Sequence, residues 1–148
     1  MIDLPPAYVQ QAKADSQPVV FVCEHGTVKS VLALAWFRKY AAERGIKVRA
    51  VSRGTALDPA IPAPVAVGMQ RDGISPGSYT PTLFSDADIA SAALVVSFDN
   101  AGAQSRAAGR TGTSQWDKLP AVSADYRVAS DSIRARVKRL VDSLATKR

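Results

Sequence analysis

The sequence predicts a single α/β domain with a doubly wound, four-stranded parallel sheet and helices on both faces. Two observations carry this prediction. Apolar strand-like segments alternate with helical segments, and the first strand is apolar on both of its faces, as strands of a covered parallel sheet are. The chain has 148 residues, enough to bury roughly 68–70% of its unfolded surface in one core. We expect residues 1–17 to be a flexible lead-in and residues 18–148 to form the domain.

The first half of the chain contains two strands and a long helix. The continuous apolar run 19–23 predicts a buried strand. Residues 29–44 have helical periodicity, and Gly45 marks the helix end because glycine readily adopts the left-handed conformation of a C-terminal cap. Residues 46–51 are expected to form the second strand. The buried side of the helix is predicted to carry Leu32, Ala35, Trp36 and Tyr40.

Proline and capping signals delimit the middle of the chain. Three prolines between positions 59 and 64 bar an early helix, so the next helix is expected to end near Asp72. Ser85, with Asp88 three residues later, predicts a capping-box start for a short helix. A strand over 94–98 should follow this helix.

The last third combines a polar loop with a basic helix. Residues 100–114 have no periodicity and predict an exposed loop, whereas the final helix carries an apolar stripe. Residues 1–100 sum to zero charge, so the net charge of +6 lies wholly in residues 101–148. Cations on the final helix indicate a solvated face, and no exposed aromatics interleave with them, so we expect no nucleic-acid partner. The apolar stripe comprises Ile133, Val137, Leu140 and Leu144.

Cysteine and histidine usage excludes several classes of site. One cysteine allows no internal disulfide, and one histidine beside it makes a structural metal site untenable, so we expect no metal and no other cofactor. No apolar run reaches the ~18 residues of a membrane span, and residues 1–17 do not resemble a signal peptide. We expect a cytoplasmic monomer or weak dimer without a membrane partner. A periplasmic location would require a leader that had been removed.

The sole cysteine, Cys23, lies where the first strand turns into the first helix. Backbone N–H groups of such a turn and the positive end of the helix dipole stabilise both a thiolate and a phosphate-like anion. Cys23 is therefore predicted to be a nucleophile, with Lys29 and Ser30 beside it. A lone buried cysteine that merely packs is the alternative. The predicted phosphate-binding residues are Glu24, His25, Gly26, Thr27, Val28, Lys29 and Ser30.

The spacing Cys23, five residues, then Lys29 and Ser30 resembles the Cys-x5-Arg-Ser loop of the low-molecular-weight protein tyrosine phosphatases and thiol-dependent arsenate reductases. Lys29 replaces the family's arginine, and Gly26 replaces an asparagine that props the loop. Glycine reaches positive φ unaided, so the second change is readily accommodated. Lysine lacks the two-point guanidinium grip, and losing one charge-assisted hydrogen bond costs about 1.5–3 kcal/mol, or about a 10- to 150-fold lower rate.

Later segments extend the resemblance over residues 18–148. The family's Asp-Pro-Tyr general acid has its counterpart near Asp125, without the proline, and Asp117 is the alternative. Either carboxylate has a structural alternative as a cap or turn residue. His25 would either assist Cys23 or bond a nearby carbonyl, and Glu24 is expected to point outward because a carboxylate would repel a phosphate. The other matching segments are 50–55, 64–74 and 93–99.

The resemblance implies two-step phosphoryl transfer through a cysteinyl phosphate. Cys23 would attack phosphorus, the loop and Lys29 would hold the equatorial oxygens, Ser30 would support the thiolate, and Asp125 would protonate the leaving oxygen. The expected partner is a phosphorylated substrate or a phosphate-like oxyanion. Two alternatives stay open: arsenate reduction with an external thiol, and a degenerate member that binds an oxyanion without turnover.

Overall fold

The computed structural model describes residues 17–99, 101, 112–122 and 124–146. Its centre is a four-stranded sheet in the order β2-β1-β3-β4, in which every neighbouring pair is parallel. The central strand β1 is buried along its whole length. The strands are β1 (Val19–Cys23), β2 (Ala50–Gly54), β3 (Leu94–Phe98) and β4 (Thr113–Trp116).

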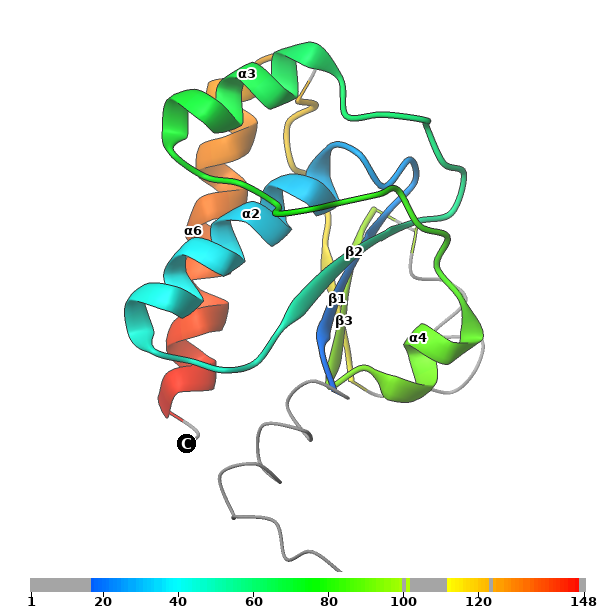
Figure 1. Cartoon of the computed structure of the whole chain (residues 1–148), viewed down its shortest axis with the longest axis vertical. Helices are drawn as coiled ribbons and strands as arrows, with labels where there is room; N and C mark the ends of the chain where they lie inside the picture. Colours follow the sequence, from blue (N-terminus) through cyan, green and yellow to red (C-terminus); the bar gives the residue numbers. More distant parts are fainter. Residues whose placement is uncertain (1–16, 100, 102–111, 123, 147–148) are drawn as a thin grey trace, which may run out of the picture.

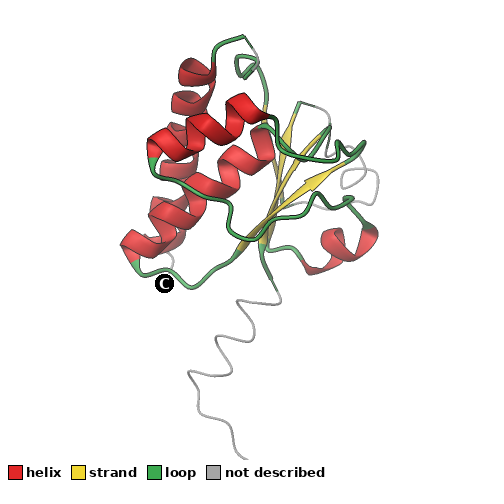
Figure 2. Ribbon diagram, turned by 45° about the horizontal axis from the view of Figure 1, so that its top comes forward, coloured by secondary structure: helices red, strands yellow, loops and turns green. Residues whose placement is uncertain are grey.

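Helices cover both faces of this sheet. Three of them pack on one face, and the short fourth lies on the other (Figures 1 and 2). The larger core lies between the sheet and the three helices, and a smaller one forms under α4 from Val20, Val22, Phe84, Ile89, Ala92 and Val95. The predicted fold class is therefore confirmed. The helices are α2 (Lys29–Arg44), α3 (Ala63–Asp72), α4 (Asp86–Ser91) and α6 (Tyr126–Thr146).

The larger core is built around four aromatic rings. Phe21 on β1 contacts Phe37 of α2 and Trp116 of β4, with ring centroids 6.0 and 5.8 Å apart. Phe98 of β3 packs edge-on against the same Trp116 at 5.7 Å. The rings thus join three strands to α2, so the start of α2 is firmly placed relative to the end of β1.

The second strand begins later than predicted. Gly45 has φ of 66°, and the N–H group of Ile46 bonds to the carbonyl of Ala41 at 2.9 Å, which closes the end of α2. Ile46 is therefore held by the helix cap rather than by the sheet, and parallel pairing starts only at Ala50, opposite Val19. The predicted strand over 46–51 was wrong at both ends, since β2 runs to Gly54.

Other local predictions can be compared directly. The capping box at Ser85 and Asp88 is present, and α2 has the predicted bounds. The predicted loop over 100–114 falls mostly on residues outside those described, but Thr113 and Ser114 belong to β4.

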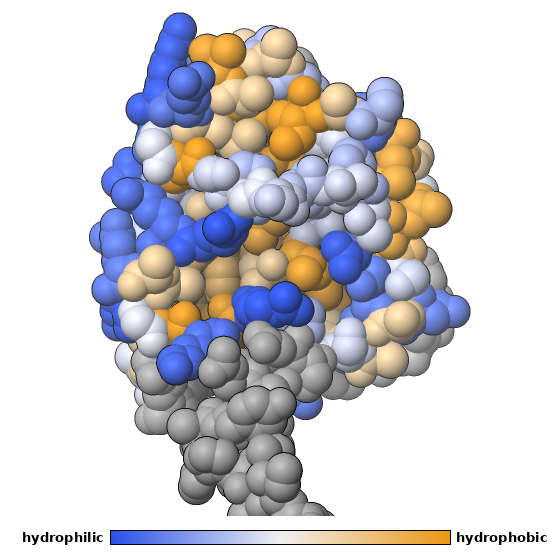
Figure 3. Space-filling view, in the orientation of Figure 1, coloured by the Kyte–Doolittle hydropathy of each residue, from blue (hydrophilic) through white to orange (hydrophobic). Residues whose placement is uncertain are grey.

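The exposed side of α6 is polar. Hydrophilic residues gather along the side of the molecule where α6 lies (Figure 3). One of its cations is more than a solvated charge, because the Arg134 guanidinium stacks 5.1 Å from the Trp36 ring and donates to the Tyr40 hydroxyl at 2.6 Å. Among the described helices, none combines the length and hydropathy needed to cross a membrane.

Candidate active site

A cavity of about 310 Å3 opens at the carboxyl edge of the sheet, where β1 delivers Cys23. In doubly wound folds this edge is the usual ligand site, because the strand-to-helix turns converge there. Four segments line the cavity: the loop after β1, the start of α3, the residue after β3 and the connection from β4 to α6. Its lining includes Cys23, Glu24, His25, Lys29, Asp99 and Ala121.

The loop between β1 and α2 turns its carbonyl groups toward neighbouring backbone. The Glu24 carbonyl accepts from the N–H groups of Thr55 and Ala56 at 2.8 and 2.7 Å, and the His25 carbonyl accepts from Asp58. By contrast, none of the N–H groups of residues 24–31 donates to another described residue. The loop and the first turn of α2 thus keep a set of donors for an anion, reinforced by the helix dipole.

Two glycines, Gly26 and Gly54, allow the loop after β1 to lie in close contact with β2. Gly26 has φ of 69°, a conformation that side chains disfavour. A Cβ atom at Gly54 would lie only 2.7 Å from the Gly26 nitrogen. The hydroxyl of Tyr79 donates to the Gly26 carbonyl, and burial raises the pKa of Tyr79, which keeps this donor protonated. The contacts with Gly54 and Tyr79 therefore hold the loop in place.

The thiol of Cys23 lies at the end of a short chain of hydroxyl groups. Its Sγ atom is 3.0 Å from Ser30 Oγ, and the Ser52 hydroxyl donates to the same Ser30 oxygen at 2.7 Å. Because Ser30 accepts from Ser52, its own proton is free to point at the sulfur. Both serines are fully buried or nearly so. A hydrogen bond donated by Ser30 would stabilise negative charge on the sulfur during reaction.

Lys29 reaches across the cavity to Asp99. Their Nζ and Oδ2 atoms are 3.2 Å apart, and the Lys29 side chain is only 17% exposed. Asp99 follows β3 directly and has φ of 59°, which is uncommon outside glycine and tends to occur at functional sites. The carboxylate thus neutralises the cavity's cation.

His25 and Glu24 lie at the rim. The His25 Nδ1 atom is 3.0 Å from the Ala56 carbonyl, which can only accept, so Nδ1 carries a proton. This is the structural alternative that the sequence left open. The Glu24 side chain is 72% exposed, as expected for a carboxylate that avoids the anion. Inside the loop, Thr27 is fully buried, and its hydroxyl has no hydrogen-bond partner among the described residues.

The two carboxylates predicted as general acids lie outside the cavity lining. Asp125 is exposed, and its Oδ1 accepts from the Val128 N–H group, which caps α6. Asp117 follows β4, and one of its oxygens is buried without a hydrogen-bond partner in the described part of the chain. In this region the cavity is lined by Ala121, Val122 and Tyr126. Two lining residues do carry carboxylates: Glu24, whose side chain is largely exposed at the rim, and Asp99.

Tyr126 fastens the start of α6 to α3. Its hydroxyl donates to Asp72 Oδ2 at 3.0 Å, and burial raises the pKa of Tyr126 to about 12. Arg127 donates to the other Asp72 oxygen at 2.6 Å. Gly68 makes room for the ring, because a Cβ atom there would lie 2.2 Å from it. The wall of the cavity opposite Cys23 is therefore held by this cluster.

Sequence reasoning missed three residues that the fold brings to the site: Ser52, Tyr79 and Asp99. Asp99 directly follows β3, and Ser52 lies within β2, so each belongs to a strand that pairs with β1; this neighbourhood is the signal that could have identified them. Tyr79 lies in an irregular segment, and nothing in its local sequence points to the loop.

The chain is similar to a known protein family. A family model described as low molecular weight phosphotyrosine protein phosphatase matches residues 18–122. No curated protein sequence matches significantly.

Several solved structures share the fold at low sequence identity. YfkJ from Bacillus subtilis superposes with a TM-score of 0.80 at 18% identity, covering 89% of this chain and 96% of its own. A thioredoxin-dependent arsenate reductase from Corynebacterium glutamicum has a TM-score of 0.74 at 18% identity, covering 95% of this chain and 71% of its own. A YwlE arginine phosphatase variant with a phosphorylated active-site serine has a TM-score of 0.70 at 18% identity, covering 88% and 95%.

Proposed function

Because the chain belongs to the low-molecular-weight phosphotyrosine protein phosphatase family, we propose that it is a cysteine-dependent phosphomonoester hydrolase working through a cysteinyl-phosphate intermediate. The observation that carries the proposal is the Cys23 loop, whose carbonyls are bonded away from it and whose N–H groups are left for an oxyanion. A related phosphatase has been captured with phosphate on its active-site side chain, which supports the same chemistry here.

In the first step the Cys23 thiolate attacks phosphorus in line, and the ester P–O bond breaks as the S–P bond forms. The loop N–H groups and Lys29 hold the three equatorial oxygens, whose charge rises toward the transition state. The leaving oxygen takes a proton from a carboxylic acid. In the second step water attacks phosphorus, gives its proton to that carboxylate and releases phosphate, while Ser30 stabilises the departing thiolate at 3.0 Å.

Two carboxylates are candidates for the acid. Asp125 stays a prediction, and in the structure its carboxylate caps α6. Asp99 is the stronger candidate, because it lines the cavity beside Lys29. Its carboxyl group would lie beside a phosphate held by Lys29, within reach of the leaving oxygen. Asp99→Asn should then reduce turnover more than Asp125→Asn.

A second candidate function is oxyanion binding without turnover. It is favoured by the connection from β4 to α6, which places Ala121 and Val122 rather than a carboxylate at the cavity. A third is arsenate reduction, in which an external thiol is needed because Cys23 is the only cysteine of the chain.

One experiment separates the three functions. The protein is assayed for phosphate release from p-nitrophenyl phosphate and, separately, for arsenate reduction in the presence of glutathione, with Cys23→Ser as the control. Phosphate release that Cys23→Ser abolishes supports the hydrolase. Thiol-dependent arsenate turnover without phosphate release overturns it in favour of the reductase. Saturable phosphate binding with neither turnover leaves the oxyanion-binding function.

A further inference from the structure

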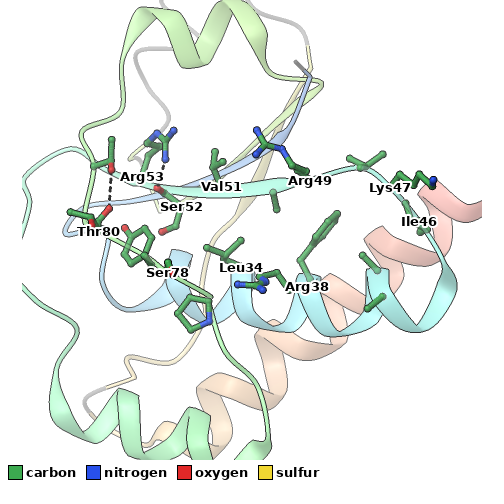
Figure 4. A pocket seen from close by; sticks show the side chains of 18 residues that line it. Leu34, Arg38, Ile46, Lys47, Arg49, Val51, Ser52, Arg53, Ser78 and Thr80 are labelled. Atoms are coloured by element: carbon green, nitrogen blue, oxygen red, sulfur yellow. Dashed lines mark hydrogen bonds between the residues drawn. The ribbon is translucent and has the colours of Figure 1, made fainter. Parts of the chain in front are cut away.

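A second hollow, of about 670 Å3, lies between α2, the outer edge of β2 and the segment 76–82 (Figure 4). It shares no lining residue with the Cys23 cavity. Residues 46–53 line it continuously, so it runs along the strand as a groove rather than enclosing a point. The face that contains it mixes hydrophilic and apolar groups (Figure 3).

The floor of this groove is an open sheet edge. Val19 donates to the Arg49 carbonyl, so odd-numbered residues of β2 turn their backbone groups toward β1. Even-numbered residues face outward, and Gly54 accordingly bonds to the passing segment at Thr82 and Phe84. The next outward residues, Ala50 and Ser52, have N–H groups that donate to no described residue. The chain's own extension of the sheet thus stops at Gly54. On the rest of this edge the Ser52 carbonyl accepts from the Arg53 guanidinium at 2.9 Å, whereas the N–H groups of Ala50 and Ser52 stay available within the described part of the chain.

The groove is positively charged. Four cations line it and none of the lining residues is a carboxylate; Arg53 is balanced by Asp88 at 3.1 Å, and Arg49 also has an interaction of its own. Arg38 and Lys47 have no hydrogen-bond or ion-pair partner among the described residues. The Arg38 guanidinium extends along α2 toward the segment that carries Ser78 (Figure 4) and packs over Gly77, where a Cβ atom would lie 1.6 Å from it. The groove is therefore shaped around an unpaired guanidinium.

We propose that this groove binds an extended acidic peptide segment of a partner protein, which adds to the sheet as a strand beside β2. Main-chain hydrogen bonds from the N–H groups of Ala50 and Ser52 would supply affinity, as in other complexes formed by strand addition. Alternate side chains of such a strand point to opposite faces. Acidic residues on the face toward α2 would meet Arg38. This binding surface is separate from the proposed hydrolase chemistry.

The test uses a fluorescein-labelled peptide of about ten residues with alternating glutamate and threonine. Fluorescence anisotropy should give a Kd on the order of 10–100 μM at low salt. In the amide spectrum of the full chain, the largest shifts should fall on residues 47–53. Arg38→Glu should weaken binding by about tenfold or more, because it replaces a charge-assisted bond with repulsion. Lys138→Glu on α6 makes the same charge change away from the groove and should weaken binding by less than about twofold.

Backbone pairing is tested by a fully N-methylated peptide of the same sequence, which keeps the charge but loses its donors. It should bind at least tenfold more weakly, because it loses one or more hydrogen bonds between uncharged groups. Equal binding of both peptides, or equal losses for Arg38→Glu and Lys138→Glu, would show general charge attraction and overturn the proposal. So would largest shifts at residues 24–30, or no saturation below about 1 mM.

Discussion

Removing the hydroxyl groups of Ser30 and Ser52 should slow the reaction of Cys23 with an alkylating agent. The effects of the two substitutions on the rate should not add. Ser30 lies 3.0 Å from the sulfur, and Ser52 donates to Ser30 at 2.7 Å. If the Ser30 proton stabilises negative charge on the sulfur, Ser30→Ala loses a charge-assisted hydrogen bond of about 1.5–3 kcal/mol, which sets an upper limit of about 10- to 150-fold on the fall in rate. The sulfur that remains is a stronger nucleophile, with a Brønsted slope of about 0.4–0.5. The net fall in rate is therefore about 3- to 15-fold.

Ser52 acts only through Ser30 in this scheme. Ser52→Ala loses one neutral hydrogen bond, worth about 1 kcal/mol, and should slow alkylation by up to about fivefold. In the Ser30→Ala background the same change should have no further effect on the rate. Iodoacetamide labelling at neutral pH measures all four proteins, with Ser143→Ala on the exposed side of α6 as the control and thermal unfolding as the check on folding. Additive effects of Ser30→Ala and Ser52→Ala would refute the chain of hydroxyl groups.

Three further predictions concern the cavity and its walls. Lys29→Arg should restore the two-point grip on phosphate oxygens and raise aryl phosphate turnover by up to about 10- to 150-fold, and a variant that binds phosphate as its parent does without faster turnover would contradict this. Gly68→Ala should lower the free energy of unfolding by about 1–2 kcal/mol in urea titrations, because its methyl group would overlap the Tyr126 ring at 2.2 Å, and unchanged stability would contradict the packing. Tyr126 has a folded pKa of about 12, above its unfolded value, so its contribution is complete below pH ~10 and is lost as the pH rises to about 12. Urea unfolding at pH ~8 and ~11 should show a decline of about 1 kcal/mol, after allowance for solvent screening, that Tyr126→Phe removes; an equal decline in both proteins would exclude Tyr126 as its source.

The sequence predicted the parts of the molecule that local pattern determines. The strand-turn-helix at Cys23 is contiguous, so its residues and the bounds of α2 could be derived before any tertiary contact was known. The capping box at Ser85 is equally local. The start of β2 was misplaced because Ile46 satisfies the helix cap, a preference that hydrophobicity alone does not distinguish from strand pairing.

The surroundings of the nucleophile depend on chain crossings that periodicity does not specify. Asp99 meets Lys29 only because β3 lies next to β1, and Ser52 meets Ser30 only because β2 occupies the other side. Asp125 was chosen by its spacing before the last helix, a position that also suits a helix cap, and its carboxylate does cap α6 in the structure. Spacing alone does not separate these two roles.

The central claim is that Cys23 carries the phosphoryl group between the two steps, and trapping that species tests it most directly. The protein is mixed with p-nitrophenyl phosphate, quenched in acid during turnover and digested, and the peptide containing Cys23 is examined by mass spectrometry. We predict a phosphorylated Cys23 whose abundance during turnover falls when substrate is exhausted, and no such species in Cys23→Ser. Turnover that continues with Cys23 unmodified, or that survives in Cys23→Ser, would contradict the account.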